Sequence, residues 1–311
     1  FGLFQKVDGG YLYQGLMLLG SGSNAVDFRD SNASIVVANT KNVSSVFNTI
    51  EVRNASSRVD WTNVSFNVLS GTVSRGNFVV TDNAELNITG SAFTDMGTFN
   101  LQSNSTFYNS TFRRCQLITQ SGSKLNGCTI ENTADSIKAV LSDNPTNILN
   151  CNFTSAGTKH GLEIRVTGSY SFSGNTFSGY AAADGDTGNE CVYNNSSGSL
   201  TLNISDAGSP TVRNGTGAST TVNSTVSITV TPLATGSEVR AYRVSDGAEL
   251  DGVETSSGSS HVLSLASGVA VNIVVLCYSP PKIPVRIENV SFTVSQNLNP
   301  FQRDDPNFSN P

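Results

Sequence analysis

The side chains that could act as general acids and bases in this sequence are mainly carboxylates, because the two histidines, His160 and His261, lie far apart in the chain. Five acidic residues are candidates: Asp82, Glu85, Asp95, Asp135 and Asp143. Enzymes that cleave polysaccharides hold two such groups at a separation set by the mechanism. Asp82 and Asp143 stand in turn-like sequence, where Asp is typical of a chain reversal. We therefore predict no catalytic residues, with glycan cleavage as the alternative.

Two further groups of charged residues could bind a ligand. Arg113 and Arg114 form the only adjacent basic pair, which a lyase acting on acidic sugars would need beside its base. The stretch AAADGDTGNE carries oxygen ligands of the kind that calcium prefers, on Asp184, Asp186, Asn189 and Glu190. It lacks the twelve-residue EF-hand pattern, so an ordinary loop is favoured. We predict no metal site and no cofactor, and we expect His160, in TKHG, to be an exposed loop residue.

The tryptophan and several tyrosines could either be ordinary structural residues or bind a sugar. Trp61 fits a core or an interface as well as a ligand platform, and three tyrosines could stack on sugars: Tyr108, Tyr180 and Tyr193. Scattered Tyr is equally typical of an ordinary β surface. The five cysteines show no CxxC spacing, and their odd number argues against a disulfide framework or a zinc site.

The composition indicates an all-β protein with few charges. Of 311 residues, 44 are Ser, 30 Thr and 33 Asn, whereas charged residues make up 14%, against about 25% in an average soluble domain. The net charge is −6 and the 18 Lys and Arg are scattered, which argues against a nucleic-acid partner. No apolar run is long enough to span a membrane. Fifteen N-x-[ST] sequons make a secreted glycoprotein an open alternative, although the richness in Asn, Ser and Thr explains most of them.

A loose repeat of about 24 residues organises residues 28–213. Each copy holds short alternating segments, a turn, and a closing aromatic residue or Ile. The closers are Phe66, Phe93, Phe112, Ile130, Phe153 and Phe177. One copy cannot bury its apolar face alone, so we predict a right-handed parallel β-helix in which each closer lies over the next. The apolar segment 1–27 is expected to cap its open end.

The turns of the repeat are predicted at Asn or Gly, which tolerate a left-handed backbone. These residues are Asn54, Asn83, Asn104, Gly122, Asn144 and Gly168, flanked by Asn32 and Gly198. Cys128 and Cys151 each stand two residues before a closer, so both are expected to point inward on adjacent coils. Inert core thiols are favoured over a disulfide between them.

The pattern changes near residue 200 to longer alternating strands. A Gly/Ser/Thr-rich linker at 214–220 is the predicted boundary, and residues 220–296 are predicted to form a small immunoglobulin-like β-sandwich. The last segment, 297–311, has three prolines and no alternation, so an extended C-terminal arm or a disordered tail is expected.

Several runs of the sequence resemble uncharacterised virion structural proteins of marine tailed bacteriophages. They are GLFQKVDGGYLYQGLM at 2–17, FRDSN at 28–32, TDNA at 81–84, FTDMGTF at 93–99 and TFRRC at 111–115. The similarity extends over most of the chain. It implies a surface component of a phage particle, as a capsid decoration, a fibre or a tail appendage. Phage β-helices are commonly trimers, so the resemblance also implies a homotrimer that contacts other virion proteins.

Three functions therefore remain in view. The favoured one is a non-enzymatic structural protein on the virion surface, which could also hold a host surface glycan. The first alternative is a tailspike depolymerase, which three carboxylates converging in a groove would support. The second is a cell-surface adhesin or filament subunit, which the sequons and the C-terminal arm would suit.

Overall fold

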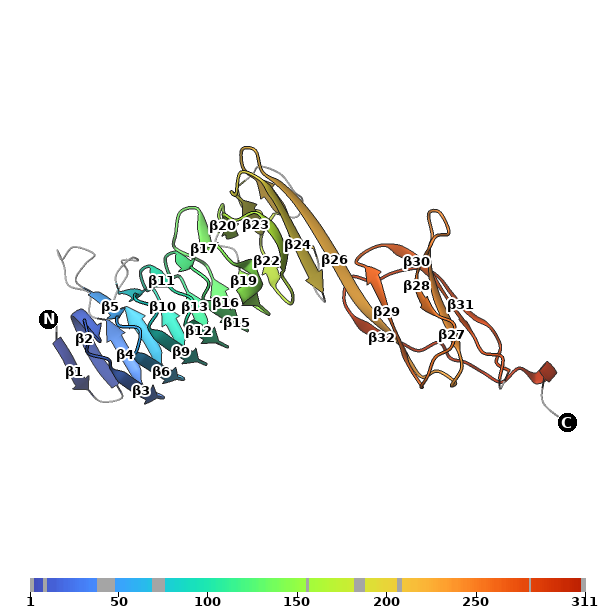
Figure 1. Cartoon of the computed structure of the whole chain (residues 1–311), viewed down its shortest axis with the longest axis horizontal. Helices are drawn as coiled ribbons and strands as arrows, with labels where there is room; N and C mark the ends of the chain where they lie inside the picture. The colour runs from blue at the N-terminus through green and yellow to red at the C-terminus, as the bar shows by residue number, and fades with distance from the viewer. Residues whose placement is uncertain are drawn as a thin grey trace. The chain divides into compact units, whose positions relative to one another are not determined.

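The computed structural model describes residues 3–7, 10–37, 48–68, 76–154, 157–181, 188–205, 209–279 and 281–308, and the chain is all-β (Figure 1). It divides into two compact units. The N-terminal unit comprises residues 1–202 and 210–221. The C-terminal unit comprises residues 203–209 and 222–311.

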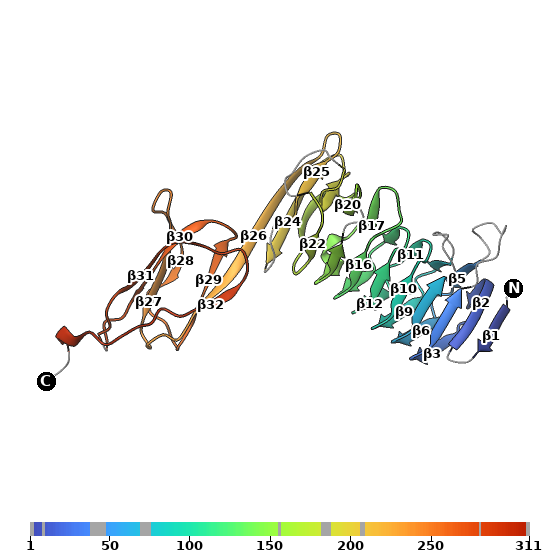
Figure 2. The ribbon, with the colours of Figure 1, turned by 180° about the vertical axis from the view of Figure 1, so that it is seen from behind.

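Three stacks of parallel strands make up most of the N-terminal unit (Figure 2). Sheet A contains β4 (Ser34–Val37), β7 (Ser65–Val68), β10 (Ala92–Thr94), β13 (Thr111–Arg113), β16 (Thr129–Glu131), β19 (Asn152–Thr154) and β22 (Thr176–Ser178). Sheet B contains β5 (Asn48–Val52), β8 (Asn77–Val80), β11 (Phe99–Leu101), β14 (Ile118–Gln120), β17 (Lys138–Ser142), β20 (His160–Ile164), β23 (Val192–Asn194) and β25 (Val212–Asn214). Sheet C contains β3 (Asp27–Ser31), β6 (Arg58–Thr62), β9 (Glu85–Thr89), β12 (Ser105–Tyr108), β15 (Lys124–Asn126) and β18 (Ile148–Leu149). Strands of the three sheets alternate along the chain, which is compatible with the predicted β-helix.

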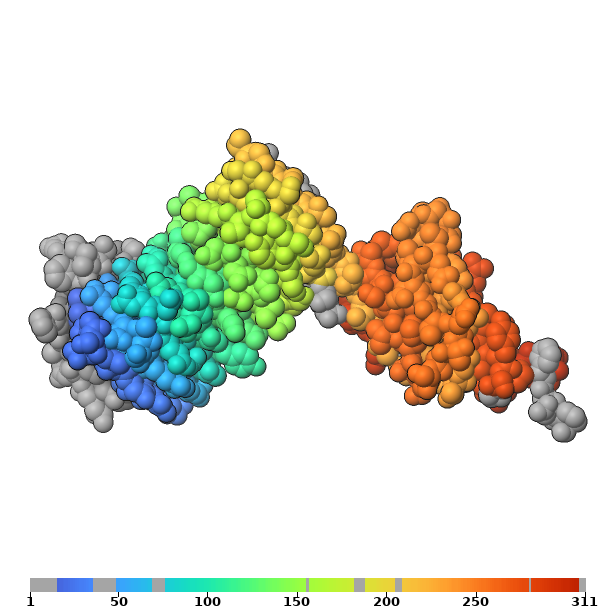
Figure 3. All heavy atoms as spheres, in the orientation of Figure 1, coloured from blue at the N-terminus to red at the C-terminus, as the bar shows by residue number. Residues whose placement is uncertain are grey.

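Each coil, which is one repeat of the three sheets, lies on the preceding coil. The colours of Figure 3 therefore follow one another in chain order along the unit. The strand register explains why. Phe66, Phe93 and Phe112 are successive partners in sheet A, and Ile130, Phe153 and Phe177 continue the series. The predicted column of closers is confirmed, although Phe177 is only partly buried.

The interior of the coils is a continuous packing of rings. Phe93 is fully buried and stacks on Phe66 at 5.1 Å and on Phe112 at 5.2 Å between ring centroids. It also meets Phe99 and Phe107 edge-on, at 5.2 and 5.8 Å. Such pairs add to the free energy of burial because the ring edge is positive and the face negative.

Trp61 lies in this interior with 1% of its surface exposed, and it contacts Phe28, Phe66 and Phe78. The core interpretation of Trp61 is thus confirmed. It is the only tryptophan of the chain. Its fluorescence therefore reports the unfolding of the N-terminal unit alone.

Cys128 and Cys151 point inward as predicted, and both are buried free thiols. They continue a column that begins with Ser91 and Ser110, whose hydroxyls donate to the carbonyl two residues earlier at 3.1 Å. The thiols make the same contact, at 3.7 Å from Cys128 to Asn126 and 3.3 Å from Cys151 to Leu149. Cysteine here occupies a serine position of the coil.

The corner between sheets C and A is a column of left-handed residues, each three positions before a residue of the sheet A interior. The column comprises Asn32, Asn63, Gly90, Asn109, Gly127, Asn150 and Gly174. Where an Asn of this column is succeeded by a Gly on the next coil, the Asn side-chain amide lies against the glycine Cα. A Cβ on Gly127 would lie 2.2 Å from Oδ1 of Asn109. At position 127 the space beside Asn109 excludes a Cβ, and glycine also adopts the left-handed backbone without strain.

We expect Gly127→Ala to lower the free energy of unfolding of the N-terminal unit by at least about 1 kcal/mol, because alanine is strained in a left-handed conformation and displaces Asn109. Gly22→Ala is the matched control, since Gly22 also has positive φ (52°) but nothing within 4 Å of an added Cβ. Urea denaturation followed by Trp61 fluorescence measures both. Equal losses would mean that the contact with Asn109 contributes nothing.

The predicted turn residues are partly corrected. Asn32, Asn54, Asn83, Gly122 and Gly168 have positive φ, but Asn144 has φ −145° and precedes a 3-10 turn, Pro145–Asn147. Asn104 and Gly198 are not left-handed either. Asn104 lies in a turn without positive φ, and it donates its amide to the carbonyl of Asn83 at 2.8 Å, so its side chain links two coils.

The N-terminal segment, predicted to cap the coils, contributes strands to their sheets. β1 (Leu3–Val7) pairs antiparallel with β2 (Gly10–Leu19). β2 itself pairs parallel with β4 through Tyr11–Tyr13 and with β5 through Gly15–Leu19. The parallel stacks therefore begin at Tyr11, inside the predicted cap 1–27, because the free edges of both sheets accept this strand.

The C-terminal unit packs two groups of strands around one core, whose buried residues include Val226, Ile228, Val239, Leu263 and Ile273. One sheet has the order β28 (Glu249–Val253), β27 (Glu238–Arg243), β30 (Ala270–Leu276) and β31 (Val285–Ser291). In the other group, β26 (Ser219–Val230) pairs antiparallel with β29 (His261–Ala266) and parallel with β32 (Gln296–Leu298). β21 (Gly168–Ser171) belongs to the N-terminal unit, and β24 (Ser199–Ser205) begins in that unit and ends in residues 203–209 of the C-terminal unit.

Residues 203–209 belong to the C-terminal unit, and residues 210–221 belong to the N-terminal unit again. The chain passes to the C-terminal unit for the second time at residue 222, just past the predicted linker 214–220. Residues 297–305 are held on the C-terminal unit, since Asn297 and Leu298 pair with the edge of β26. Gln302 accepts from the backbone N–H of Ala234 at 2.8 Å. A three-residue edge strand has too little pattern to be visible in the sequence. Residues 309–311 lie outside the described part.

Candidate functional site

The five carboxylates singled out in the sequence are placed apart. Glu85 begins a strand of sheet C, Asp95 follows a strand of sheet A, and Asp82 and Asp143 follow different strands of sheet B. Asp135 lies in the connection before β17. The structure therefore does not bring these groups together in one groove.

Most of these carboxylates have a local partner instead. Asp95 binds Arg114 through two hydrogen bonds of 2.7 and 2.8 Å, and Oδ1 of Asp143 accepts from the backbone N–H of Gly122 at 2.8 Å. Asp135 accepts from two backbone N–H groups, of residues 137 and 138. Arg113 pairs with Glu131 at 2.7 Å, so the two adjacent arginines serve different carboxylates.

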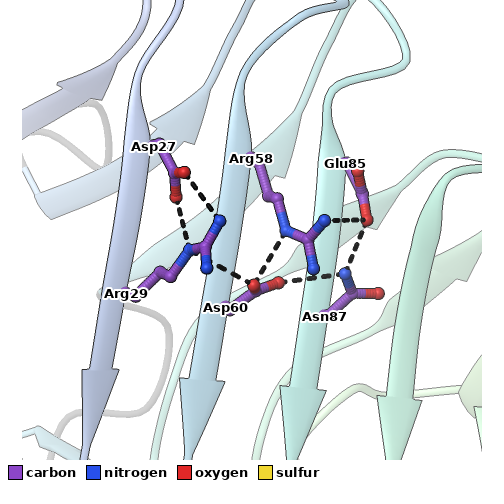
Figure 4. A network of polar contacts seen from close by, with 6 residues as sticks. All are labelled: Asp27, Arg29, Arg58, Asp60, Glu85 and Asn87. Carbon is purple, nitrogen blue, oxygen red and sulfur yellow. Dashed lines mark hydrogen bonds and ion pairs between the residues drawn. The ribbon is translucent and has the colours of Figure 1, made fainter.

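Charges on sheet C form a ladder of alternating sign (Figure 4). The register places Asp27, Arg58 and Glu85 in one column, and Arg29, Asp60 and Asn87 in the next. Asp60 accepts from Arg58 at 2.8 Å and from Asn87 at 3.0 Å. Although burial opposes ionisation, these hydrogen bonds lower the pKa of Asp60. The ladder joins three successive coils on the outer face of the unit.

Asp184 and Asp186 of the calcium-like stretch lie outside the described residues. Glu190 is fully buried, and its Oε2 accepts from the backbone N–H of Gly188 at 3.1 Å and lies 3.8 Å from Nδ1 of His160. Among the described residues, no three His, Cys, Asp or Glu side chains are grouped so that they could hold a metal ion.

Sheet B holds a buried ion pair, in which the side chain of Glu163 is 1% exposed and that of Lys138 10%. The carboxylate also accepts from Nε of Arg165 at 2.6 Å and from Nδ2 of Asn195 at 3.1 Å. Burial alone would raise the pKa of Glu163, but the hydrogen bonds from Lys138, Asn195 and Arg165 outweigh it and lower the pKa.

His160 is 1% exposed, which corrects the predicted exposed loop. It begins β20, and its ring stacks on Tyr193 with 4.8 Å between centroids. The following Gly161 lies within the strand and makes no turn. A Cβ there would lie 3.0 Å from the Phe177 ring and from the Cys191 carbonyl, so a larger residue would have to displace one of them. Arg213 covers the Tyr193 ring, with Cζ 5.1 Å from the centroid.

The pKa shifts of His160 and Glu163 are expected to make the N-terminal unit less stable in acid. Burial lowers the pKa of His160, against the opposing influence of Glu190. Folding then favours the neutral ring, so its contribution is complete above the unfolded pKa of about 6.5 and is lost as the pH falls below it. The lowered pKa of Glu163 acts in the same direction, below the unfolded carboxyl pKa of about 4.3.

We therefore expect the melting temperature of the N-terminal unit to fall in two steps as the pH is lowered from 7 to 3. His160→Gln should remove the step near pH 6, because no imidazole then takes up a proton on unfolding. Glu163, Glu190 and Arg213, the charged groups near the ring, remain in that variant. Trp61 fluorescence during heating measures the effect. A step near pH 6 that persists in His160→Gln would refute its assignment to this residue.

The tyrosines are divided among different environments. Tyr108 is 46% exposed on sheet C. Tyr180 packs edge-on against Phe177, and burial raises the pKa of its hydroxyl. The sequence interpretation missed Lys138, Glu163 and Arg165. The alternation in HGLEIRV, with Glu163 and Arg165 two residues apart, was the available signal for a charged outer face.

The chain matches no protein family, no curated protein and no solved structure with which it was compared. In the part of the chain that the structure describes, no helix has the length and apolar character needed to cross a bilayer.

Proposed function

We propose that this chain is a non-enzymatic structural protein on the surface of a tailed-bacteriophage particle, as a capsid decoration, a fibre or a tail appendage. We further propose that its stacked strands form a right-handed parallel β-helix, that the C-terminal unit is an immunoglobulin-like sandwich, and that three copies assemble. The resemblance of residues 2–17 and 93–99 to phage virion proteins supports this function.

The observation that supports it best is that the charged side chains on the outer face of sheet C form ion pairs between successive coils. Arg58 reaches Asp60 on its own strand at 2.8 Å and Glu85 on the next coil at 3.5 Å. An isolated exposed ion pair contributes little, but a network held by a fixed strand spacing is more favourable. These side chains connect coil to coil, which suits a part that must keep its shape outside a cell.

The carboxylates bear on the depolymerase alternative. Asp95 and Asp143 lie next to different sheets, and each is engaged by a neighbouring coil. That alternative therefore gains no support from these groups. The adhesin or filament alternative remains an outcome of the experiment below.

Gold-labelled antibodies against the folded chain, applied to purified particles of the phage that encodes it, test the proposal. We expect labelling at regular positions of the head or tail, and peptides of the chain in digests of the same particles. Light scattering of the isolated protein should give three times its 32.7 kDa. Particles without the chain would refute the virion function, whereas open filaments of the pure protein would favour the adhesin alternative.

A further inference from the structure

The outer face of sheet B has a hollow of about 130 Å³ beside β14, β17 and β20. The last two of these strands are labelled next to each other in Figure 1. Its lining includes Thr119, Ser121, Leu141, Asp143 and Arg165, together with the buried Gln120 and Ser142. The hollow lies within the N-terminal unit and involves none of the five carboxylates except Asp143.

The strand register explains why these residues meet. Thr119 and Leu141 are partners across β14 and β17, and Leu141 pairs in turn with Glu163 of β20. Asp143 and Arg165 each follow the last residue of their strand. Their backbone N–H groups donate to the preceding coil, at Gln120 and Ser142, both at 3.3 Å. Parallel strands about 4.8 Å apart thus bring the two charged side chains to the same corner.

Both charged groups are held in place before any ligand arrives. Asp143 uses Oδ1 to accept from Gly122, and Arg165 uses Nε to donate to the buried Glu163. Within the described residues, Oδ2 of Asp143 and both Nη atoms of Arg165 make no hydrogen bond. Positioned polar groups of this kind lose little entropy on binding.

The chemistry of the lining favours an uncharged ligand rich in hydroxyls. Asp143 can only accept hydrogen bonds and Arg165 can only donate them, whereas the hydroxyls of Thr119 and Ser121 do both. The carboxylate of Asp143 would repel a free anion, and the guanidinium of Arg165 would repel a free cation. Leu141, partly exposed in the same lining, provides an apolar contact for C–H groups.

We propose that this hollow binds one neutral hexopyranose unit of a glycan. Vicinal hydroxyls are donors and acceptors at once, so they match the pair formed by Asp143 and Arg165, while the C–H face of the ring lies on Leu141. The volume is below the roughly 300 Å³ of pockets for drug-sized ligands, which limits the site to a single ring. This site does not depend on whether the chain belongs to a phage particle.

Saturation-transfer NMR on the full 311-residue chain, with the methyl pyranosides of glucose, galactose and mannose, tests the proposal. We expect saturable binding of at least one of them, weakened about tenfold in Arg165→Gln and in Asp143→Asn, because each removes a hydrogen bond to a charged group. Methyl glucuronide and glucosamine should bind more weakly than the neutral sugar.

Arg113→Gln is the matched control. The side chains of Arg113 and Arg165 are both 52% exposed, and each donates Nε to a glutamate, but Arg113 lies on sheet A. This variant should bind like the unaltered chain, and Trp61 fluorescence verifies folding of all variants. The proposal is overturned if none of the three pyranosides binds, if binding survives both substitutions at the hollow, if Arg113→Gln loses it equally, or if a charged sugar binds best.

Discussion

Phe93→Ala is expected to lower the free energy of unfolding of the N-terminal unit by about 3–5 kcal/mol. The Phe93 ring is fully buried and contacts four other rings, of Phe66, Phe99, Phe107 and Phe112. Its removal leaves a cavity that cannot close, because the coils above and below are fixed by their strand hydrogen bonds. Urea denaturation monitored by Trp61 fluorescence gives the value.

Phe93→Leu is the control for this substitution, because it keeps much of the volume and should cost less than about 2 kcal/mol. The melting of the C-terminal unit, followed by circular dichroism, should be unaffected by either change. If Phe93→Ala costs no more than Phe93→Leu, the ring column is not the main source of stability in these coils.

Glu163→Ala is expected to cost a similar amount, about 3–5 kcal/mol, because it leaves the ammonium of Lys138 buried without its counter-ion. Lys138 is 10% exposed, so water cannot replace the carboxylate. Arg165, whose side chain is 52% exposed, can turn to solvent and contributes little to the loss. The measurement is again urea denaturation at pH 7.

The double variant Lys138→Met/Glu163→Leu separates the two causes of that loss. Replacing both members of a buried ion pair with apolar side chains is often neutral, so this variant should recover most of the stability lost in Glu163→Ala. Failure to recover would mean that Glu163 matters through Arg165 and Asn195, and not through the buried ion pair with Lys138.

The interior of the coils was largely predictable from the sequence. The left-handed corner between sheets C and A was also predictable, but it was missed. Apolar alternation with closing aromatics predicted the column from Phe66 to Phe177, because stacking is the only way for such short strands to bury a face. An Asn or Gly stands three residues before each closer, as in Asn63 before Phe66 and Gly127 before Ile130. This spacing marks the left-handed corner better than Asn104 or Asn144, which were chosen because they follow apolar segments.

The charged groups could not be assigned from the sequence in the same way. Lys138 and Glu163 are 25 positions apart in coils of unequal length, and their contact depends on the register of β17 and β20. A change of one residue in either connection would move one of them away from its partner. His160 was expected in an exposed loop for the same reason, since local turn signals do not reveal that Tyr193 of the next coil covers the ring.

By itself, then, the sequence determined that the chain is all-β, that it stacks short strands, and which aromatic residues lie inside, because these follow from periodicity and from the need to bury apolar surface. Only the tertiary structure decided which polar residues meet. It separated Asp95 from Asp143, joined Lys138 to Glu163, and placed Arg165 beside Asp143 and Leu141. The physical reason is that neighbours on an outer face come from different coils, and the lengths of the connections set their alignment.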